Sequence, residues 1–166
     1  NLHETFQTNI EIDTSSKEYN TWFRSITKIK NLDKESIEVK KLYASFMNFR
    51  DYSNDRKLFK DYTYYIELFA KWNVTYNLTA VKGTKAILER HILDSLSVHS
   101  FIEGEHCLDI GTGAGLPGMI LVLAQPEKQW TLSDSNQKKI RFLRHITADL
   151  NIKNVKLVHA RIETFK

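Results

Sequence analysis

The chain has 166 residues, 42% of them hydrophobic, which is enough for one domain, or for a small domain with an attached helical region. Its longest apolar run, residues 119–124, is far shorter than the roughly 18 apolar residues that a membrane helix needs, so we predict no membrane partner. A single cysteine, Cys107, excludes an internal disulfide and favours a cytoplasmic location.

Charge is distributed unevenly along the chain, although the net charge is only +4. Residues 136–166 contain eight Lys or Arg against two acidic residues, whereas residues 1–135 have a net charge of −2. A basic end on a near-neutral body favours a polyanionic partner such as nucleic acid, and solvated helices show the same pattern.

The first half of the chain has a helical pattern. Residues 1–82 contain neither glycine nor proline. Apolar spacing predicts a helix over residues 16–30, capped by Ser16 or the serine before it, and a helix of about five turns after residues 53–55. A third helix is predicted over residues 82 to about 100. We interpret the aromatic stripe of the second helix as core rather than as a platform for base stacking; the stripe is Tyr62, Tyr65, Phe69 and Trp72.

The pattern changes after Gly104. Apolar strands are predicted at residues 106–110, 130–133 and 155–159, with helices at 119–124 and 137–150. Cys107 is expected to be a buried small hydrophobe in the first strand. This alternation is the opening of a doubly wound parallel sheet, so we predict an α/β, Rossmann-like fold with only its first three strands, after an N-terminal helical region. The expected parts are an N-terminal extension (1–50), a helical lead-in (51–103) and the first half of the α/β domain (104–166).

Residues 109–118, DIGTGAGLPG, join the first strand to the following helix. Closely spaced glycines at such a position bring backbone N–H groups toward a ligand at the positive end of a helix. Pro117 fits the first helical turn. Asp134, at the end of the next strand, is expected to accept both hydroxyls of a ribose. The loop therefore predicts a cofactor that contains adenosine.

Two cofactors fit this loop. Gly113, Gly115 and Gly118 satisfy the dinucleotide fingerprint, which would make the chain a nicotinamide-dependent oxidoreductase. Asp109, two residues before Gly111, instead resembles the start of the acidic-x-Gly-x-Gly-x-Gly loop of methyltransferases, which cradles the methionine end of S-adenosylmethionine. We favour S-adenosylmethionine, with Asp109 either meeting the ammonium of the cofactor or holding the shape of the loop.

Four stretches go beyond a generic cofactor fold: KWNVTYNLTAV at 71–81, RHILDSL at 90–96, DIGTGAGLPG at 109–118 and KKIRFLR at 138–144. With residues 155–165 they make the chain resemble, over roughly residues 52–166, the ribosomal small-subunit methyltransferase G family, also called glucose-inhibited division protein B. The Leu-Pro-Gly end of the loop and the Lys-x-x-Arg-Phe-Leu-Arg helix carry most of this resemblance.

The resemblance implies an S-adenosylmethionine-dependent enzyme that methylates N7 of a guanine, guanine 527, in the 16S rRNA of the small ribosomal subunit. It implies cofactor contacts at Gly111, Leu116, Ile162 and Glu163, the last of which would accept the adenine amino group. No catalytic residue is assigned, because guanine N7 already presents a lone pair and alignment with exclusion of water suffices. The full predicted cofactor set is Asp109, Gly111, Gly113, Gly115, Leu116, Asp134, Ile162 and Glu163.

The target base has to be single-stranded or splayed out to be reached. Phosphate contacts are expected from the basic helix, with four candidates: Lys138, Lys139, Arg141 and Arg144. In the RHILDSL stretch, an ion pair between Arg90 and Asp94 is the plain explanation, and a role for His91 in holding the base is the alternative. The histidines and carboxylates show no metal-ligand spacing, so we predict no metal.

The chain departs from the family in two ways. It ends just after the third strand, without the further strands and the Ser-Arg-Ala segment that the family has near the cofactor. We therefore expect a fragment or natural truncation, a monomer, with weak cofactor binding, little independent catalysis and an unpaired apolar edge on its first strand. Residues 1–40 precede the usual start of the family, and we expect an extra helix there rather than a separate binding module.

Two alternatives to the rRNA methyltransferase remain. One is a non-catalytic RNA-binding or assembly fragment, and the other is the nicotinamide-dependent oxidoreductase.

Overall fold

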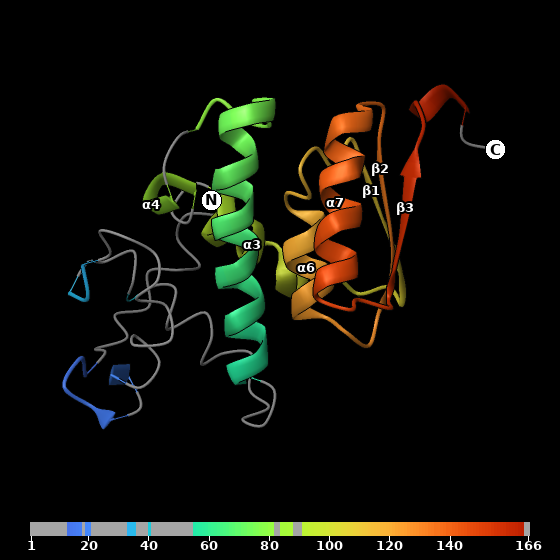
Figure 1. Ribbon diagram of the computed structural model, residues 1–166. Helices are drawn as coiled ribbons and strands as arrows, with labels where there is room; N and C mark the ends of the chain where they lie inside the picture. Colours follow the sequence, from blue (N-terminus) through green and yellow to red (C-terminus); the bar gives the residue numbers. More distant parts are fainter. Residues whose placement is uncertain are drawn as a thin grey trace.

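A computed structural model describes residues 13–17, 19–20, 33–35, 40, 55–81, 84–87 and 91–164 of the chain. The described helices are α3 (Asp55–Tyr76), α4 (Thr84–Ile87), α5 (Leu93–Ser97), α6 (Gly118–Ala124) and α7 (Gln137–Asp149). The strands are β1 (His106–Ile110), β2 (Gln129–Asp134) and β3 (Val155–His159), and the short 3-10 helices are η2 (His99–Phe101) and η3 (Ile162–Thr164). Figure 1 shows the long helix α3 beside α6 and α7, with the sheet on the other side of these two helices.

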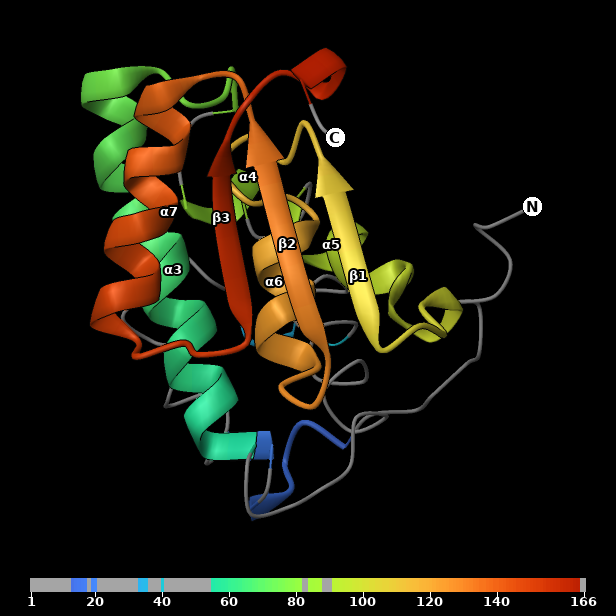
Figure 2. The same ribbon diagram turned by 90° about the vertical axis from the view of Figure 1, so that its right-hand side faces the viewer.

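The three strands form one parallel sheet in the order β1-β2-β3. Leu132 in the central strand pairs with Asp109 on one side and with Leu157 on the other. Parallel neighbours need a crossover connection, and here α6 and α7 provide the two crossovers and cover the same face of the sheet (Figure 2). The predicted α/β, Rossmann-like fold with three strands is thereby confirmed.

The two faces of the sheet differ in burial because side chains alternate along a strand. On the helix-covered face, Leu132 is fully buried and Trp130 is 4% exposed. On the other face, which Figure 2 turns toward the viewer, Leu108 and Ile110 of β1 are 52% and 44% exposed. β1 lies at the edge of the sheet, as expected, and no other described strand pairs with its outer side.

Helix α3 supplies much of the remaining core. Four of its residues at helical spacing are at most 3% exposed: Tyr62, Tyr65, Ile66 and Phe69. They meet α7, where the Phe142 ring centroid lies 5.8 Å from that of Tyr65 and 5.7 Å from that of Phe69. A fully buried ring of this size contributes roughly 1.5–3 kcal/mol to stability. The aromatic stripe is core, as predicted, with Trp72 half-buried at its end.

Within the helix predicted over residues 82 to about 100, the structure describes α4, α5 and η2, and residues 82–83 and 88–90 lie outside the described part. α5 ends at Ser97, whose hydroxyl donates to a backbone carbonyl three residues earlier. The next backbone bond, from Phe101 N–H to the Val98 carbonyl, also spans only three residues. The serine competes with the helical hydrogen-bond pattern, and the chain tightens into a 3-10 turn. The spacing of apolar residues does not predict this change from an α-helix to a 3-10 turn.

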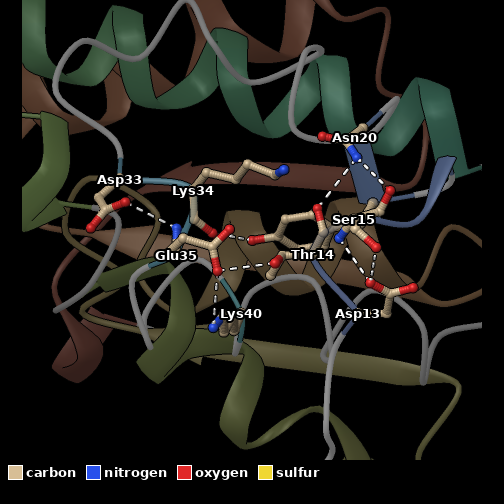
Figure 3. A network of polar contacts seen from close by, with 9 residues as sticks. Asp13, Thr14, Ser15, Asn20, Asp33, Lys34, Glu35 and Lys40 are labelled. Carbon is tan, nitrogen blue, oxygen red and sulfur yellow. Dashed lines mark hydrogen bonds and ion pairs between the residues drawn. The ribbon is translucent and has the colours of Figure 1, made fainter.

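A polar network links the described residues of the N-terminal part (Figure 3). Thr14 Oγ1 donates to the Glu35 carboxylate at 3.0 Å, and Lys40 Nζ lies 3.3 Å from the same carboxylate. Tyr19 is fully buried, and its hydroxyl donates to the carbonyl of Lys34. Two segments about 20 residues apart therefore lie side by side, but the role of residues 1–50 stays a prediction.

The helix predicted over residues 16–30 falls mostly outside the described residues. Part of its first turn is described, without residue 18: Ser16 Oγ accepts the N–H of Tyr19 at 3.1 Å, and the Ser16 carbonyl accepts the N–H of Asn20 at 3.0 Å. A hydroxyl that accepts from the third residue after it is a helix cap, so the predicted serine cap is confirmed at Ser16.

Cys107 is half-buried rather than fully buried, because β1 is an edge strand. Among the residues that the structure describes, no helix combines the length and apolar character needed to cross a membrane. The predicted ion pair between Arg90 and Asp94 lies outside the described residues, because Arg90 does.

Candidate functional site

The carboxyl ends of the three parallel strands meet at one edge of the sheet (Figure 2). The predicted site residues converge there: the glycine loop follows β1, Asp134 is the last residue of β2, and Ile162 and Glu163 follow β3. Ligands of open α/β sheets bind at this edge, where the loops that leave the strands can vary without disturbing the core.

The first half of the glycine loop turns back toward β2. The N–H groups of Gly111 and Thr112 both donate to the carbonyl of Ser133, at 2.7 and 2.9 Å. Gly111 and Gly113 have φ values of +74° and +62°, in the left-handed region that side chains disfavour. A Cβ on Gly111 would have no atom within 4 Å, so the loop surface is open at this point.

The second half of the loop is packed instead of open. Gly115 is buried with φ +95°, and a Cβ there would lie 2.6 Å from Met119 Cβ and 2.7 Å from Leu143 Cδ2. A Cβ on Gly118 would lie 2.4 Å from Asp109 Oδ2. These two glycines let the loop pack closely against α6, α7 and the end of β1.

The loop N–H groups, which were expected to point at a ligand, are engaged within the protein. Six of them donate to protein oxygens: those of Gly111, Thr112, Gly113, Gly115, Leu116 and Gly118. A loop of this kind has few N–H donors left for a pyrophosphate, which requires several. The carbonyl oxygens of Thr112, Ala114 and Gly115 also accept hydrogen bonds within the protein. The expectation that backbone N–H groups bind the ligand stays a prediction, although these six already donate to protein oxygens.

Asp109 links the end of β1 to the start of α6. Its Oδ2 accepts the N–H of Gly118 at 2.9 Å. Burial raises the pKa of the Asp109 carboxyl group, and the hydrogen bond from Gly118 partly offsets this effect. Of the two roles predicted for Asp109, this geometry supports the holding of the loop, while a contact with the cofactor ammonium stays a prediction.

Asp134 faces the glycine loop across the edge of the sheet and is only 8% exposed. Its Oδ2 accepts the N–H of Gly113 at 2.8 Å, and its Oδ1 accepts the N–H of Asn136 at 2.7 Å. A carboxylate has about four acceptor positions, so two remain for the hydroxyls of a ligand. The orientation of Asp134 agrees with the predicted ribose contact, which itself stays a prediction.

The start of α7 forms the side of the site next to β2. Asn136 caps the helix, its side chain accepting the N–H of Lys138 at 2.9 Å. Sequence reasoning missed this cap, although an asparagine directly before the periodic run was a usable signal. Lys139 is half-buried with its Nζ 3.8 Å from the position of a Cβ on Gly113. The other basic candidates are exposed: Lys138, Arg141 and Arg144.

The end of β3 is tied to the end of β2. His159 Nε2 lies 3.0 Å from the Ser135 carbonyl, and Ala160 N–H donates to the Asp134 carbonyl at 3.3 Å. Ile162, in η3, is 54% exposed, and Glu163 beside it is also exposed. Both are available at this edge, and their contacts with an adenine ring stay predictions.

Helix α3 reaches the loop from the opposite side. The Tyr65 hydroxyl donates to the carbonyl of Ala114 in the loop at 2.8 Å, and the Tyr62 hydroxyl donates to the carbonyl of Ile120 in α6 at 3.1 Å. Periodicity predicted that both rings are buried, but it contains no information on where the hydroxyls go. Tyr65 is therefore a site residue that sequence reasoning missed.

The segment after α3 folds back on the helix near His91. Asn73 Nδ2 donates to the Val81 carbonyl and Asn73 Oδ1 accepts the N–H of Thr79, both at 2.8 Å. Thr79 Oγ1 lies 3.3 Å from Nε2 of the half-buried His91. The two family-like stretches at 71–81 and 90–96 thus contact each other, and the role of His91 in holding a base stays a prediction.

Comparison with known proteins agrees with this geometry. The family model of rRNA small subunit methyltransferase G matches residues 58–166, which include most of α3, the glycine loop and all three strands. Proteins named Ribosomal RNA small subunit methyltransferase G from Nitrosococcus oceani, Hydrogenovibrio crunogenus and Legionella pneumophila are 46%, 50% and 46% identical over 102, 101 and 101 residues.

Each of these three alignments covers 61% of this chain and 48%, 47% or 49% of the relative, in the same order. The chain thus spans about half the length of the curated relatives that it matches. The family model, by contrast, matches well over half of the chain. The chain therefore belongs to the rRNA small subunit methyltransferase G family.

Proposed function

We propose that the glycine loop and Asp134 form the S-adenosylmethionine site of a methyltransferase that acts on N7 of a guanine in 16S rRNA. One observation carries the proposal: a loop with its N–H groups engaged lies against Asp134, joined to it by the bond from Gly113. The open backbone at Gly111 and the Asp134 carboxylate at the same sheet edge match a ligand that has an amino-acid end and a ribose. Membership of the family supports the same assignment.

The residues present fit this donor. Gly111 leaves an open surface for the methionine end, and Asp134 has acceptor positions left for the ribose hydroxyls. Leu116 adds a contact from the glycine loop, and Ile162 and Glu163 are available for the adenine side, with the Glu163 carboxylate as an acceptor for the amino group. Asp109 would act indirectly, by keeping the loop attached to α6.

The chemistry explains why no catalytic base is proposed. When bound, S-adenosylmethionine supplies a methyl group on a positively charged sulfur. Guanine N7 attacks with a lone pair that it already has, so no side chain has to remove a proton. What remains for the chain is to hold the donor in one orientation and to exclude water from it.

The RNA is proposed to contact α7. Lys138, Arg141 and Arg144 follow one another at intervals of three residues and are exposed, so they form one basic stripe along the helix. Such a stripe positions a phosphate backbone without reading its sequence. Lys139 was also an RNA candidate, and its position near Gly113 gives it access to the donor site as well.

The second candidate function is a non-catalytic RNA-binding or assembly fragment. It would need only the exposed basic residues of α7, and not the donor site, to contact a phosphate backbone. An oxidoreductase that uses a nicotinamide dinucleotide is disfavoured, because the engaged N–H groups leave few donors for a pyrophosphate.

Two measurements test these functions. Calorimetry with S-adenosylmethionine and with NAD identifies the cofactor, and tight binding of NAD alone would rule out the proposed site. Transfer of a labelled methyl group to unmodified 30S subunits then tests the reaction. Donor binding without incorporation of the label would favour the non-catalytic fragment.

A further inference from the structure

Two buried tyrosines on α3 are alike except for the backbone carbonyl to which each hydroxyl donates. Tyr62 and Tyr65 lie three residues apart on the same helix face, are 3% and 0% exposed, and each donates a hydroxyl hydrogen bond to a backbone carbonyl. Their acceptors differ, since Tyr62 bonds to Ile120 within helix α6, whereas Tyr65 bonds to Ala114 within the glycine loop. Burial raises the pKa of both phenols, so both remain protonated donors at neutral pH.

The acceptor of Tyr65 lies between two glycines of the loop. Ala114 lies between Gly113 and Gly115, which have φ values of +62° and +95°. Peptide groups next to glycine rotate easily, because no Cβ restricts them. The N–H end of the peptide group between Ala114 and Gly115 donates to the Thr112 carbonyl at 2.9 Å, and the Tyr65 hydroxyl holds the carbonyl end of the same group.

Other anchors of the loop come from the loop itself, where the Thr112 carbonyl accepts the N–H groups of Gly115 and Leu116, and from the sheet side. Ser133 accepts the N–H groups of Gly111 and Thr112, and Asp134 accepts that of Gly113. Tyr65 approaches from α3, a helix that is 49 residues earlier in the chain at this contact. The loop is thus fixed from two layers, and the Tyr65 hydroxyl is the contact from the helical lead-in.

We propose that Tyr65 is a positioning residue for the donor site: its hydroxyl fixes the peptide group between Ala114 and Gly115 and thereby keeps the glycine loop in the shape that binds the methyl donor. The consequence for binding rests on the function proposed above. Tyr65 does not touch the donor in this role; it acts through the loop backbone. The proposal thereby links the helical lead-in to donor affinity through the backbone of the loop.

Hydrogen exchange of the loop amides tests the positioning without any ligand. In Tyr65→Phe, which keeps the ring and removes only the hydroxyl, the amides of Gly113, Gly115 and Leu116 should exchange roughly three to ten times faster, as expected for the loss of one buried hydrogen bond. Tyr62→Phe is the matched control, because it loses the same kind of bond to α6 and should leave these amides within about twofold of wild type. Equal acceleration in both variants would reduce Tyr65 to a core residue and overturn the proposal.

Calorimetry with S-adenosylmethionine on the same three proteins tests the consequence for function. We expect Tyr65→Phe to bind the donor roughly three to ten times more weakly and Tyr62→Phe to bind it like wild type. Unchanged affinity in Tyr65→Phe, with wild type binding, would overturn the positioning role and leave the proposed function intact. If wild type itself does not bind, the proposed function and its donor-site consequence fail, while the exchange data still decide whether Tyr65 holds the loop.

Discussion

The two halves of the glycine loop contain the same residue type for different physical reasons. A Cβ on Gly111 would meet no atom within 4 Å, whereas a Cβ on Gly115 would lie 2.6 Å from Met119 Cβ. Both residues have positive φ, so backbone conformation does not distinguish them. The comparison teaches that one motif combines an open surface for a ligand with a packed anchor, and that substitutions in the two halves should separate binding from stability.

The largest effect is expected in the packed half. Gly115→Ala should lower the free energy of unfolding by about 3 kcal/mol, because strain at positive φ adds to the overlap with Met119 and Leu143. Urea denaturation followed by tryptophan fluorescence measures this loss. A loss below about 1 kcal/mol would mean that the loop can relax around the methyl group and that the packed half is not an anchor.

The next effect concerns Asp134, which holds the open half through Gly113. Asp134→Ala should weaken binding of S-adenosylmethionine by about 1–3 kcal/mol, the cost of removing charged hydrogen bonds. Asn136→Ala is the control: it should cost about 1 kcal/mol of stability through loss of the α7 cap, with donor affinity unchanged. Calorimetry and urea denaturation on both variants give the two numbers. An unaltered affinity in Asp134→Ala would put the donor elsewhere.

A smaller stability effect is expected in the open half. Gly111→Ala should cost about 1 kcal/mol of folding free energy, because only the positive φ opposes the new side chain. Donor affinity should fall by at least as much, since the methyl group occupies the surface proposed for the ligand. If stability falls as far as in Gly115→Ala, the two halves of the loop do not differ and the comparison is wrong.

The smallest effect is a pH dependence at Asp109. Its pKa in the folded protein is raised above the ordinary value of 3.8, so the folded chain holds this proton more tightly than the unfolded chain. Stability from this group is therefore greatest below that value, declines as pH rises through the raised pKa, and is constant above it. Asp109→Asn lacks the titration, so between pH 4 and 7 its stability relative to wild type should increase. Urea denaturation across that range checks the sign, and a parallel pH profile for the two proteins would contradict it.

Much of this architecture was predictable because it depends on local order in the chain. The spacing of apolar residues identified α7 and its buried positions, Ile140, Leu143 and Ile146, all of which are fully buried. The strand limits at His106–Ile110 and Val155–His159 agree with the prediction. The positions of Asp109 and Asp134 at strand ends brought both carboxylates to one sheet edge, because parallel strands share their direction.

Other features required contacts between distant segments. The bond from Tyr65 to Ala114 depends on how α3 packs on the loop, and the position of Lys139 near Gly113 depends on the rotation of α7. Neither contact can be predicted from the local spacing of apolar residues. The engaged N–H groups of the loop are a further example, since glycine spacing indicates that the backbone is free to turn but does not indicate which oxygen each N–H meets.

By itself, the sequence determined the class of fold, the family and the edge of the sheet where the site lies. Those properties follow from periodicity and from the order of strand, loop and helix, which act over a few residues at a time. Only the tertiary structure decided which glycines are packed and which are open, and which side chains hold the loop. These contacts depend on close packing between layers, where a shift of one ångström changes the partner that a hydroxyl or an ammonium group can reach.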